Sequence, residues 1–199
     1  MNAWDQFARQ KTEQIFKEKH TIIDIGGGLR IQKSNRHEKA NEWINRYLPT
    51  VDYKVLDKVP DYNPDIVGDI RALPLPSNSV DAIFCIAILA HVEEPHKAVD
   101  EMYRVLKPGG YLFMYTPFIY YYHPAPGYYS DFFRFTYDGV KYLTRNFSSS
   151  ELAPVRGPIA TVINLLPFFS RRTDMFNWLD NLFYKNSRQV SGYHSFCIK

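Results

Sequence analysis

The chain has 199 residues, which is enough for one sizeable α/β domain and short for two. Its 24 Lys and Arg exceed its 21 Asp and Glu by only three, without a basic run, so a nucleic-acid substrate is not indicated. No signal peptide opens the sequence and no apolar run approaches the roughly twenty residues that cross a bilayer, so we expect a cytoplasmic protein.

Apolar side chains recur near helical spacing over residues 2–19, which predicts a helix packed at a sheet edge or serving as a lid. The β-branched run at residues 21–25 then carries Asp24 and is followed at once by Gly26, Gly27 and Gly28. Such a run predicts a buried strand, and the glycines allow a sharp turn and close approach of a ligand. A strand, a glycine turn and a following helix are typical of the nucleotide-binding corner of a doubly wound sheet.

The spacing of the glycines narrows the kind of ligand. A dinucleotide fingerprint would need glycine at Ile31, and a P-loop would need Gly-Lys-Ser/Thr at this end of the loop. The remaining pattern is acid-x-Gly-x-Gly, which resembles motif I of the class I S-adenosylmethionine-dependent methyltransferases. That family often has a further glycine where this chain has Arg30. The arginine either changes the loop or meets the carboxylate of the cofactor's methionine part.

The next segments predict a crossover helix at residues 34–48 and a second strand at residues 53–57 that ends in Asp57. An acid at the end of this strand can accept hydrogen bonds from both ribose hydroxyls. We expect Asp57 in that role, with Asp52 and Asp61 as competitors.

Short strands and helices alternate along the rest of the chain. Further strands are expected at residues 65–70, 79–87, 111–116, 149–155 and 192–198, and helical segments at 95–106, 137–147, 159–169 and 175–184. A turn rich in Gly and Pro at residues 107–110 follows one of these helices, and Thr136 is placed to cap another. Cys85 and Cys197 lie in apolar runs, which predicts buried thiols rather than a disulfide or a metal site.

Four further segments resemble the small-molecule type of class I methyltransferase, in that family's order: residues 68–76, 79–83, 91–95 and 104–110. The resemblance runs from about residue 20 to about 145 and implies S-adenosylmethionine as cofactor. It also implies that Asp69 receives the adenine amino group, that the Ile70 amide reaches a ring nitrogen, and that Ile86 and Ala87 line the methionine side. Amino-group methyltransferases carry Asn/Asp-Pro-Pro-Tyr after the fourth strand. This chain has Cys-Ile-Ala-Ile at residues 85–88 instead, which disfavours that class.

Residues 116–136 form a long aromatic loop that we interpret as the substrate wall, with Tyr128 and Tyr129 as substrate-binding candidates. It resembles a His-x-x-Pro…Asp-Tyr-x-Arg-x-Thr segment that accompanies this methyltransferase type. His123 is the first candidate for a general base, because an unperturbed histidine titrates near pH 6.5, and Asp131 and His91 come next. Arg134 has a planar fork suited to an anionic or sugar-phosphate acceptor.

We therefore predict a single-domain α/β protein with a Rossmann-like, doubly wound, seven-stranded and mostly parallel sheet whose last strand is antiparallel, between strands five and six as in the family. Residues 1–19 are the N-terminal helix and residues 158–186 a helical insertion. The expected function is methyl transfer to a small or medium polar acceptor, such as a sugar or another hydroxyl compound. The alternatives are a non-catalytic binding or regulatory protein and an NAD(P)-dependent oxidoreductase. An apolar stripe suits a core or homodimer contact better than a membrane anchor: Met175, Trp178, Leu179 and Leu182.

Overall fold

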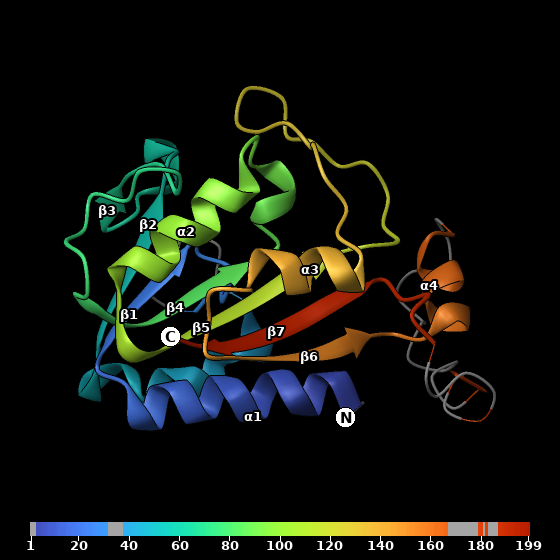
Figure 1. The fold of residues 1–199 in the computed structure, drawn as a ribbon, viewed down its shortest axis with the longest axis horizontal. Coiled ribbons are helices and arrows are strands. Elements are labelled where there is room, and N and C mark those ends of the chain that lie inside the picture. The colour runs from blue at the N-terminus through green and yellow to red at the C-terminus, as the bar shows by residue number, and fades with distance from the viewer. Residues whose placement is uncertain (1–2, 32–37, 167–178, 181, 183–186) are drawn as a thin grey trace.

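A single seven-stranded sheet organises the protein, seen in a computed structural model that describes residues 3–31, 38–166, 179–180, 182 and 187–199 (Figure 1). The strands lie in the order β3-β2-β1-β4-β5-β7-β6. Their bounds are β1 (Thr21–Ile25), β2 (Asp52–Asp57), β3 (Ile66–Val67), β4 (Val80–Ile86), β5 (Leu106–Pro117), β6 (Ser149–Val155) and β7 (Gly192–Ile198). The α-helices are α1 (Ala3–Glu18), α2 (Pro95–Val105), α3 (Tyr137–Leu143) and α4 (Pro158–Asn164), and short 3₁₀ helices are η1 (Lys39–Arg46), η2 (Leu48–Thr50), η3 (Pro60–Tyr62) and η4 (Leu89–His91).

Strand pairing confirms the predicted architecture. Strands β3, β2, β1, β4 and β5 are parallel, whereas β7 is antiparallel to both of its neighbours, β5 and β6. The chain moves outward from β1 to β3 and then returns to place β4 on the other side of β1. The carboxyl ends of β1 and β4 therefore border the topological switch point, where open α/β sheets bind ligands.

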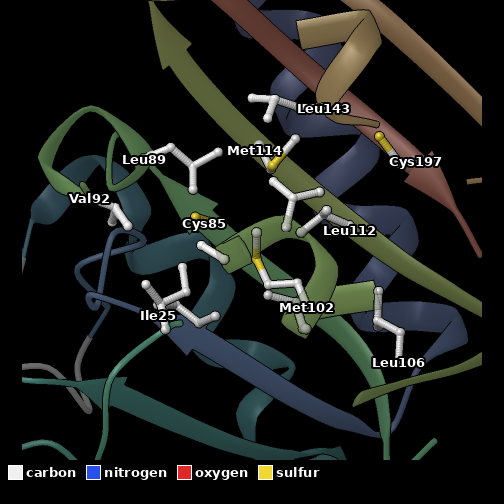
Figure 2. Close-up of a cluster of buried hydrophobic side chains, with 14 of the residues drawn as sticks. Ile25, Cys85, Leu89, Val92, Met102, Leu106, Leu112, Met114, Leu143 and Cys197 are labelled. Carbon is white, nitrogen blue, oxygen red and sulfur yellow. The ribbon is translucent and has the colours of Figure 1, made fainter. Parts of the chain in front are cut away.

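Both faces of the sheet are covered, as the near-continuous apolar strands predict. Successive residues of β1 point to opposite faces, so Ile23 packs into a cluster with α2 and α3 while Ile22 packs against α1 and η1. Figure 2 shows the first cluster, which contains Met102 of α2 and Leu143 of α3 together with Cys85 of β4 and Met114 of β5. The thiols of Cys85 and Cys197 are both free and buried, as expected.

Several predicted elements differ in length or packing. Helix α1 lies across a sheet face rather than at an edge, with Ile15 and Phe16 buried against β-strand residues (Figure 1). The expected helix at residues 34–48 is, in its described part, 3₁₀ rather than α, because backbone bonds such as that from the Tyr47 amide to the Ile44 carbonyl span three residues. Strand β3 is only two residues long and ends where Gly68 turns toward the cavity.

The other boundary differences follow from local backbone geometry. The glycine- and proline-rich residues 107–110 form an irregularity inside β5 instead of separating it from α2, since the register with β4 jumps between Leu106 and Tyr111. Helix α3 begins at the predicted cap, where the Thr136 hydroxyl accepts a 3.1 Å bond from the Gly139 amide, but it ends earlier than expected. Most of the expected helix at 175–184, including Met175 and Trp178, lies outside the described residues. No helix in the described ranges is long and apolar enough to cross a membrane.

Candidate active site

A cavity of about 780 Å³ opens at the carboxyl ends of the central strands. One side is built by the glycine loop after β1 and by the segments that follow β2, β3 and β4. The opposite side is built by Tyr115 of β5 and by the aromatic loop, residues 116–136. A volume of this size is within the range that holds a small-molecule ligand or cofactor.

Asp24 stabilises the glycine loop from the protein interior and does not line the cavity. Its carboxylate is fully buried and accepts hydrogen bonds from the amides of Gly28 and Leu29, both at 3.0 Å, and from the Tyr53 hydroxyl at 2.6 Å. Bonds of backbone amides to a carboxylate are charge-assisted and strong. The predicted motif acid therefore fixes the turn rather than touching a ligand directly.

The glycines after β1 are required by backbone angle and by space. Gly26 and Gly27 have φ of 74° and 58°, a region that L side chains rarely adopt. A Cβ on Gly26 would lie 2.2 Å from Ile88 Cδ1, and one on Gly28 would lie 2.5 Å from Ile86 Cβ. The loop thus packs closely against the segment after β4, and of these three glycines Gly26 and Gly28 line the cavity whereas Gly27 does not.

Arg30 continues this loop in a left-handed conformation, with φ of 49°. It lines the cavity, and its guanidinium is more than half exposed and 3.9 Å from the carboxylate of Glu38. On the facing segment, Ala87 also has a positive φ, of 60°, and lines the cavity beside Ile86. Non-glycine residues held in this region gather at functional sites.

Among the three candidate acids around β2, only Asp57 lines the cavity. It is the last residue of β2, is 7% exposed, and accepts a 3.0 Å bond from the Val59 amide. Asp52 lies at the other end of the strand and pairs with Lys54, and Asp61 lies in η3.

Asp69 lines the cavity beyond β3 and is joined to Arg71. Its carboxylate accepts the Arg71 amide at 2.8 Å and the guanidinium at 2.7 Å, and these bonds hold the pKa of Asp69 below its ordinary range. Arg71 also pairs with Glu93 at 3.0 Å, and all three side chains line the cavity together with Ile70. Arg71 and Glu93 were not among the predicted site residues, although both lie inside the segments that resemble the methyltransferases.

Two histidines from separate elements meet on the far side of the cavity. The rings of His91, from η4, and His123, from the aromatic loop, have centroids 4.9 Å apart, and His91 also lies 4.4 Å from the Tyr129 ring. Nδ1 of His91 lies 2.8 Å from the Ser130 carbonyl, and burial lowers the pKa of His91. Since a carbonyl only accepts, the Nδ1 of His91 carries a proton and donates a hydrogen bond to the Ser130 carbonyl.

Tyrosines complete the aromatic side. Tyr128 stacks on Tyr62 of η3 with centroids 5.4 Å apart, which joins the aromatic loop to the segment after β2. Tyr115 lines the cavity from β5, and burial raises the pKa of its hydroxyl. Tyr62 and Tyr115 were missed as site residues; their positions after β2 and near the end of β5 were the available signal.

Asp131 and Arg134 were expected to face the acceptor, but neither lines the cavity. The Asp131 side chain is fully buried and bound by both Arg134 Nη atoms, at 2.6 and 2.7 Å, which holds the pKa of Asp131 well below its usual range. The same guanidinium donates to the carbonyls of Tyr120, Tyr121 and Phe133. These two residues hold the loop together, and the Arg134 guanidinium is paired with Asp131 rather than presented to the cavity.

Comparisons with known proteins bear on the cofactor side of this site. Residues 21–114 match the family described as "Methyltransferase domain". The demethylmenaquinone methyltransferase of Renibacterium salmoninarum is 53% identical over 47 residues, 24% of this chain and 20% of that protein. The ubiquinone/menaquinone biosynthesis C-methyltransferase UbiE of Citrobacter koseri is 32% identical over 101 residues, 46% of this chain and 40% of that protein. The chain thus spans less than half the length of these curated relatives.

A solved structure shares the fold over nearly the whole chain. The SAM-dependent methyltransferase from Archaeoglobus fulgidus superposes with a TM-score of 0.61 at 13% identity, covering 96% of this chain and 92% of that one. The family match ends at residue 114, just before the aromatic loop, so the sequence likeness to the family covers the glycine loop and the acids but not the opposite wall.

Proposed function

We propose that this chain, whose residues 21–114 form a class I S-adenosylmethionine-dependent methyltransferase domain, transfers a methyl group from that cofactor to a hydroxyl of a small or medium polar acceptor. The observation that carries the proposal is the cavity at the switch point, with the motif residues on one side and a histidine-containing aromatic wall on the other.

The residues on the first side fit S-adenosylmethionine. Asp57 is placed to accept hydrogen bonds from the ribose hydroxyls, and Asp69 with the Ile70 amide to bind adenine. The turn from Gly26 to Gly28, fixed by Asp24, and Ile86 opposite it suit the methionine part. Arg30 lines the same side and adds a positive charge there.

The acceptor is an uncharged compound. The aromatic loop contains two charged side chains, Asp131 and Arg134, and these pair with each other away from the cavity. The loop residues that do line it are neutral or aromatic, including Tyr128, Tyr129 and Phe132. Tyrosine rings offer flat apolar faces with a polar edge, which suit a sugar ring or a phenol. The paired state of Arg134 argues against the anionic acceptor expected from the sequence.

His123 acts as the general base in this proposal. S-adenosylmethionine, held by Asp57, Asp69 and the turn from Gly26 to Gly28, would supply an activated methyl group on a positively charged sulfur. His123 takes the proton that the hydroxyl loses, and the rings around the cavity hold the acceptor in line. No cluster of metal-binding side chains occurs within the described part of the chain.

The relatives' names favour a second acceptor, the ring carbon of a quinone precursor. The same neutral aromatic wall would accommodate such a ring. The sequence likeness to the methyltransferase family stops before this wall, so the acceptor has to be determined by experiment.

The test is to incubate the protein with S-adenosylmethionine and three acceptor sets: neutral glycosides, a hydroquinone, and sugar phosphates. We expect S-adenosylhomocysteine to form with a neutral acceptor and not with the phosphates, and NMR of the product to show the methyl group on oxygen. Methylation at ring carbon would support the second acceptor instead. Turnover of the phosphates alone would contradict the uncharged-acceptor proposal, and absence of turnover with every set, while the cofactor binds, would favour a non-catalytic role.

A further inference from the structure

Three side chains of the aromatic loop, Arg134, Asp131 and His123, interact in series. Arg134 grips both oxygens of Asp131, and Asp131 Oδ2 lies 2.9 Å from the His123 amide and 3.2 Å from His123 Nδ1. The Asp131 carboxyl group is fully buried, and His123, which retains 28% side-chain exposure, lines the cavity. Burying a carboxylate costs desolvation free energy even when the group is paired. The position of Asp131 beside the His123 ring therefore indicates a role beyond holding the loop together.

These contacts decide which ring nitrogen of His123 carries the proton. Nδ1 faces two oxygens, the Asp131 carboxylate and the Tyr121 carbonyl at 3.0 Å. Arg134 keeps Asp131 ionised, so both oxygens can only accept hydrogen bonds. Nδ1 is therefore the donor, and Nε2 is left as the nitrogen with the lone pair.

We infer that Asp131 is a positioning residue, which orients the His123 ring and fixes its proton on Nδ1 so that Nε2 is available to take the acceptor's hydroxyl proton. This inference rests on the proposed function. The proton passes from the acceptor hydroxyl to Nε2 and gives an imidazolium, whose charge the Asp131 carboxylate balances, and it then leaves to water. Arg134 supports His123 indirectly, because its guanidinium binds Asp131 and also donates hydrogen bonds to three loop carbonyls.

The other groups that face His123 do not offer the same support. His91 contacts it from η4, but the Nδ1 of that ring is committed to the Ser130 carbonyl, and Tyr120 and Tyr121 contribute ring edges. Of the charged side chains, Asp131 alone contacts the His123 ring directly in the described part of the chain. This difference assigns the base to His123 rather than to His91.

The test combines two readouts on the full chain. Nitrogen-15 NMR of the histidines, at a pH where the rings are neutral, reports the tautomer of His123 without any turnover. Steady-state kinetics with a neutral acceptor report kcat and KM. The variants are Asp131→Ala, Asp131→Asn, and the double change Asp131→Ala with Arg134→Gln, which avoids leaving an unpaired arginine if the first variant folds poorly. Asp138→Asn, an exposed acid at the start of α3, is the matched control.

We expect wild type and Asp138→Asn to hold the proton on Nδ1. Asp131→Ala and the double variant should give a mixture of tautomers and lower kcat by about a hundredfold with little change in KM. Asp131→Asn can keep an oxygen toward His123, so it should restore the tautomer and part of kcat. A proton on Nε2 in wild type, or an unchanged tautomer in both alanine-containing variants, would overturn the inference. If the tautomer responds as expected but no acceptor is methylated, the positioning role stands and the proposed function fails.

Discussion

Arg30 shows how a single residue can depart from a motif without destroying the loop. Its φ of 49° lies in the region that glycine adopts freely, at the position where similar loops often have glycine. Holding a non-glycine residue there costs on the order of 1 kcal/mol. The loop keeps its shape because Asp24 binds two of its amides and because the Glu38 amide donates to the Arg30 carbonyl at 2.7 Å.

Asp57 is the residue on which cofactor affinity should depend most clearly. Loss of a charge-assisted hydrogen bond costs about 1.5–3 kcal/mol, and each 1.4 kcal/mol is about tenfold in affinity. Asp57→Ala should therefore weaken S-adenosylmethionine binding by about ten- to a hundredfold in a calorimetric titration. Asp52→Ala, at the opposite end of β2 and outside the cavity, should bind as wild type does. Equal affinities for the two variants, with thermal unfolding showing both to be folded, would remove Asp57 from the site.

Asp131 and Arg134 of the aromatic loop do not line the cavity, contrary to the sequence prediction, and the reason lies in where they stand in the chain. Asp57 is the last residue of β2 and Asp69 lies two residues beyond the end of β3, so the positions of both acids are set by the sheet. Asp131 and Arg134 lie in an irregular loop, where a sequence pattern cannot tell whether two opposite charges face a ligand or each other. Their mutual burial is a property of the folded loop alone.

The central strands were predictable because their apolar runs are bounded by glycine, proline and acids. The type of helix at residues 39–46 was harder to predict, because its amphipathic pattern suits an α-helix and a 3₁₀ helix equally well. Strand β3 is shorter than its apolar run predicted, since the backbone leaves the sheet at Gly68, where a Cβ would lie 2.8 Å from Pro74. The irregularity within β5 was hidden because glycine and proline usually end an element.

Strand β7 carries a partly buried histidine, His194, which makes the fold sensitive to acid. His194 packs between Phe113, at 5.4 Å, and Tyr115, at 5.3 Å, and burial with the nearby Arg156 charge lowers the pKa of His194 to about 4. The unfolded chain binds this proton near pH 6.5, so the stabilisation is complete above pH 6.5 and is lost as the pH falls toward 4.

Wild type should therefore lose up to about 1.4 kcal/mol of unfolding free energy per pH unit through His194 between pH 6.5 and 4. Denaturant unfolding at several pH values should show a flatter dependence for His194→Phe, which keeps a flat ring between the two aromatic side chains. His96→Gln, on the exposed face of α2, serves as the control and should follow wild type. The same slope in all three proteins would show that His194 does not set the acid sensitivity.

At the scale of the whole molecule, the two sides of the cavity come from different parts of the chain. The cofactor side is carried by β1 to β4, within the segment that matches the methyltransferase domain. The aromatic loop lies outside that segment and links β5 to α3, and Tyr128 reaches back to Tyr62 across the cavity. In the proposed function, the segment that matches the family binds the cofactor, and the chain's own loop contacts the acceptor.

The most direct test of this account is a calorimetric titration of the full chain with S-adenosylhomocysteine, and separately with NAD⁺ at the same concentrations. We expect saturable binding of S-adenosylhomocysteine at one site per chain and no measurable binding of NAD⁺, because Ile31 stands where the dinucleotide fingerprint needs glycine. Binding of NAD⁺ in preference to S-adenosylhomocysteine, or binding of neither, would contradict the assignment of the cavity to S-adenosylmethionine.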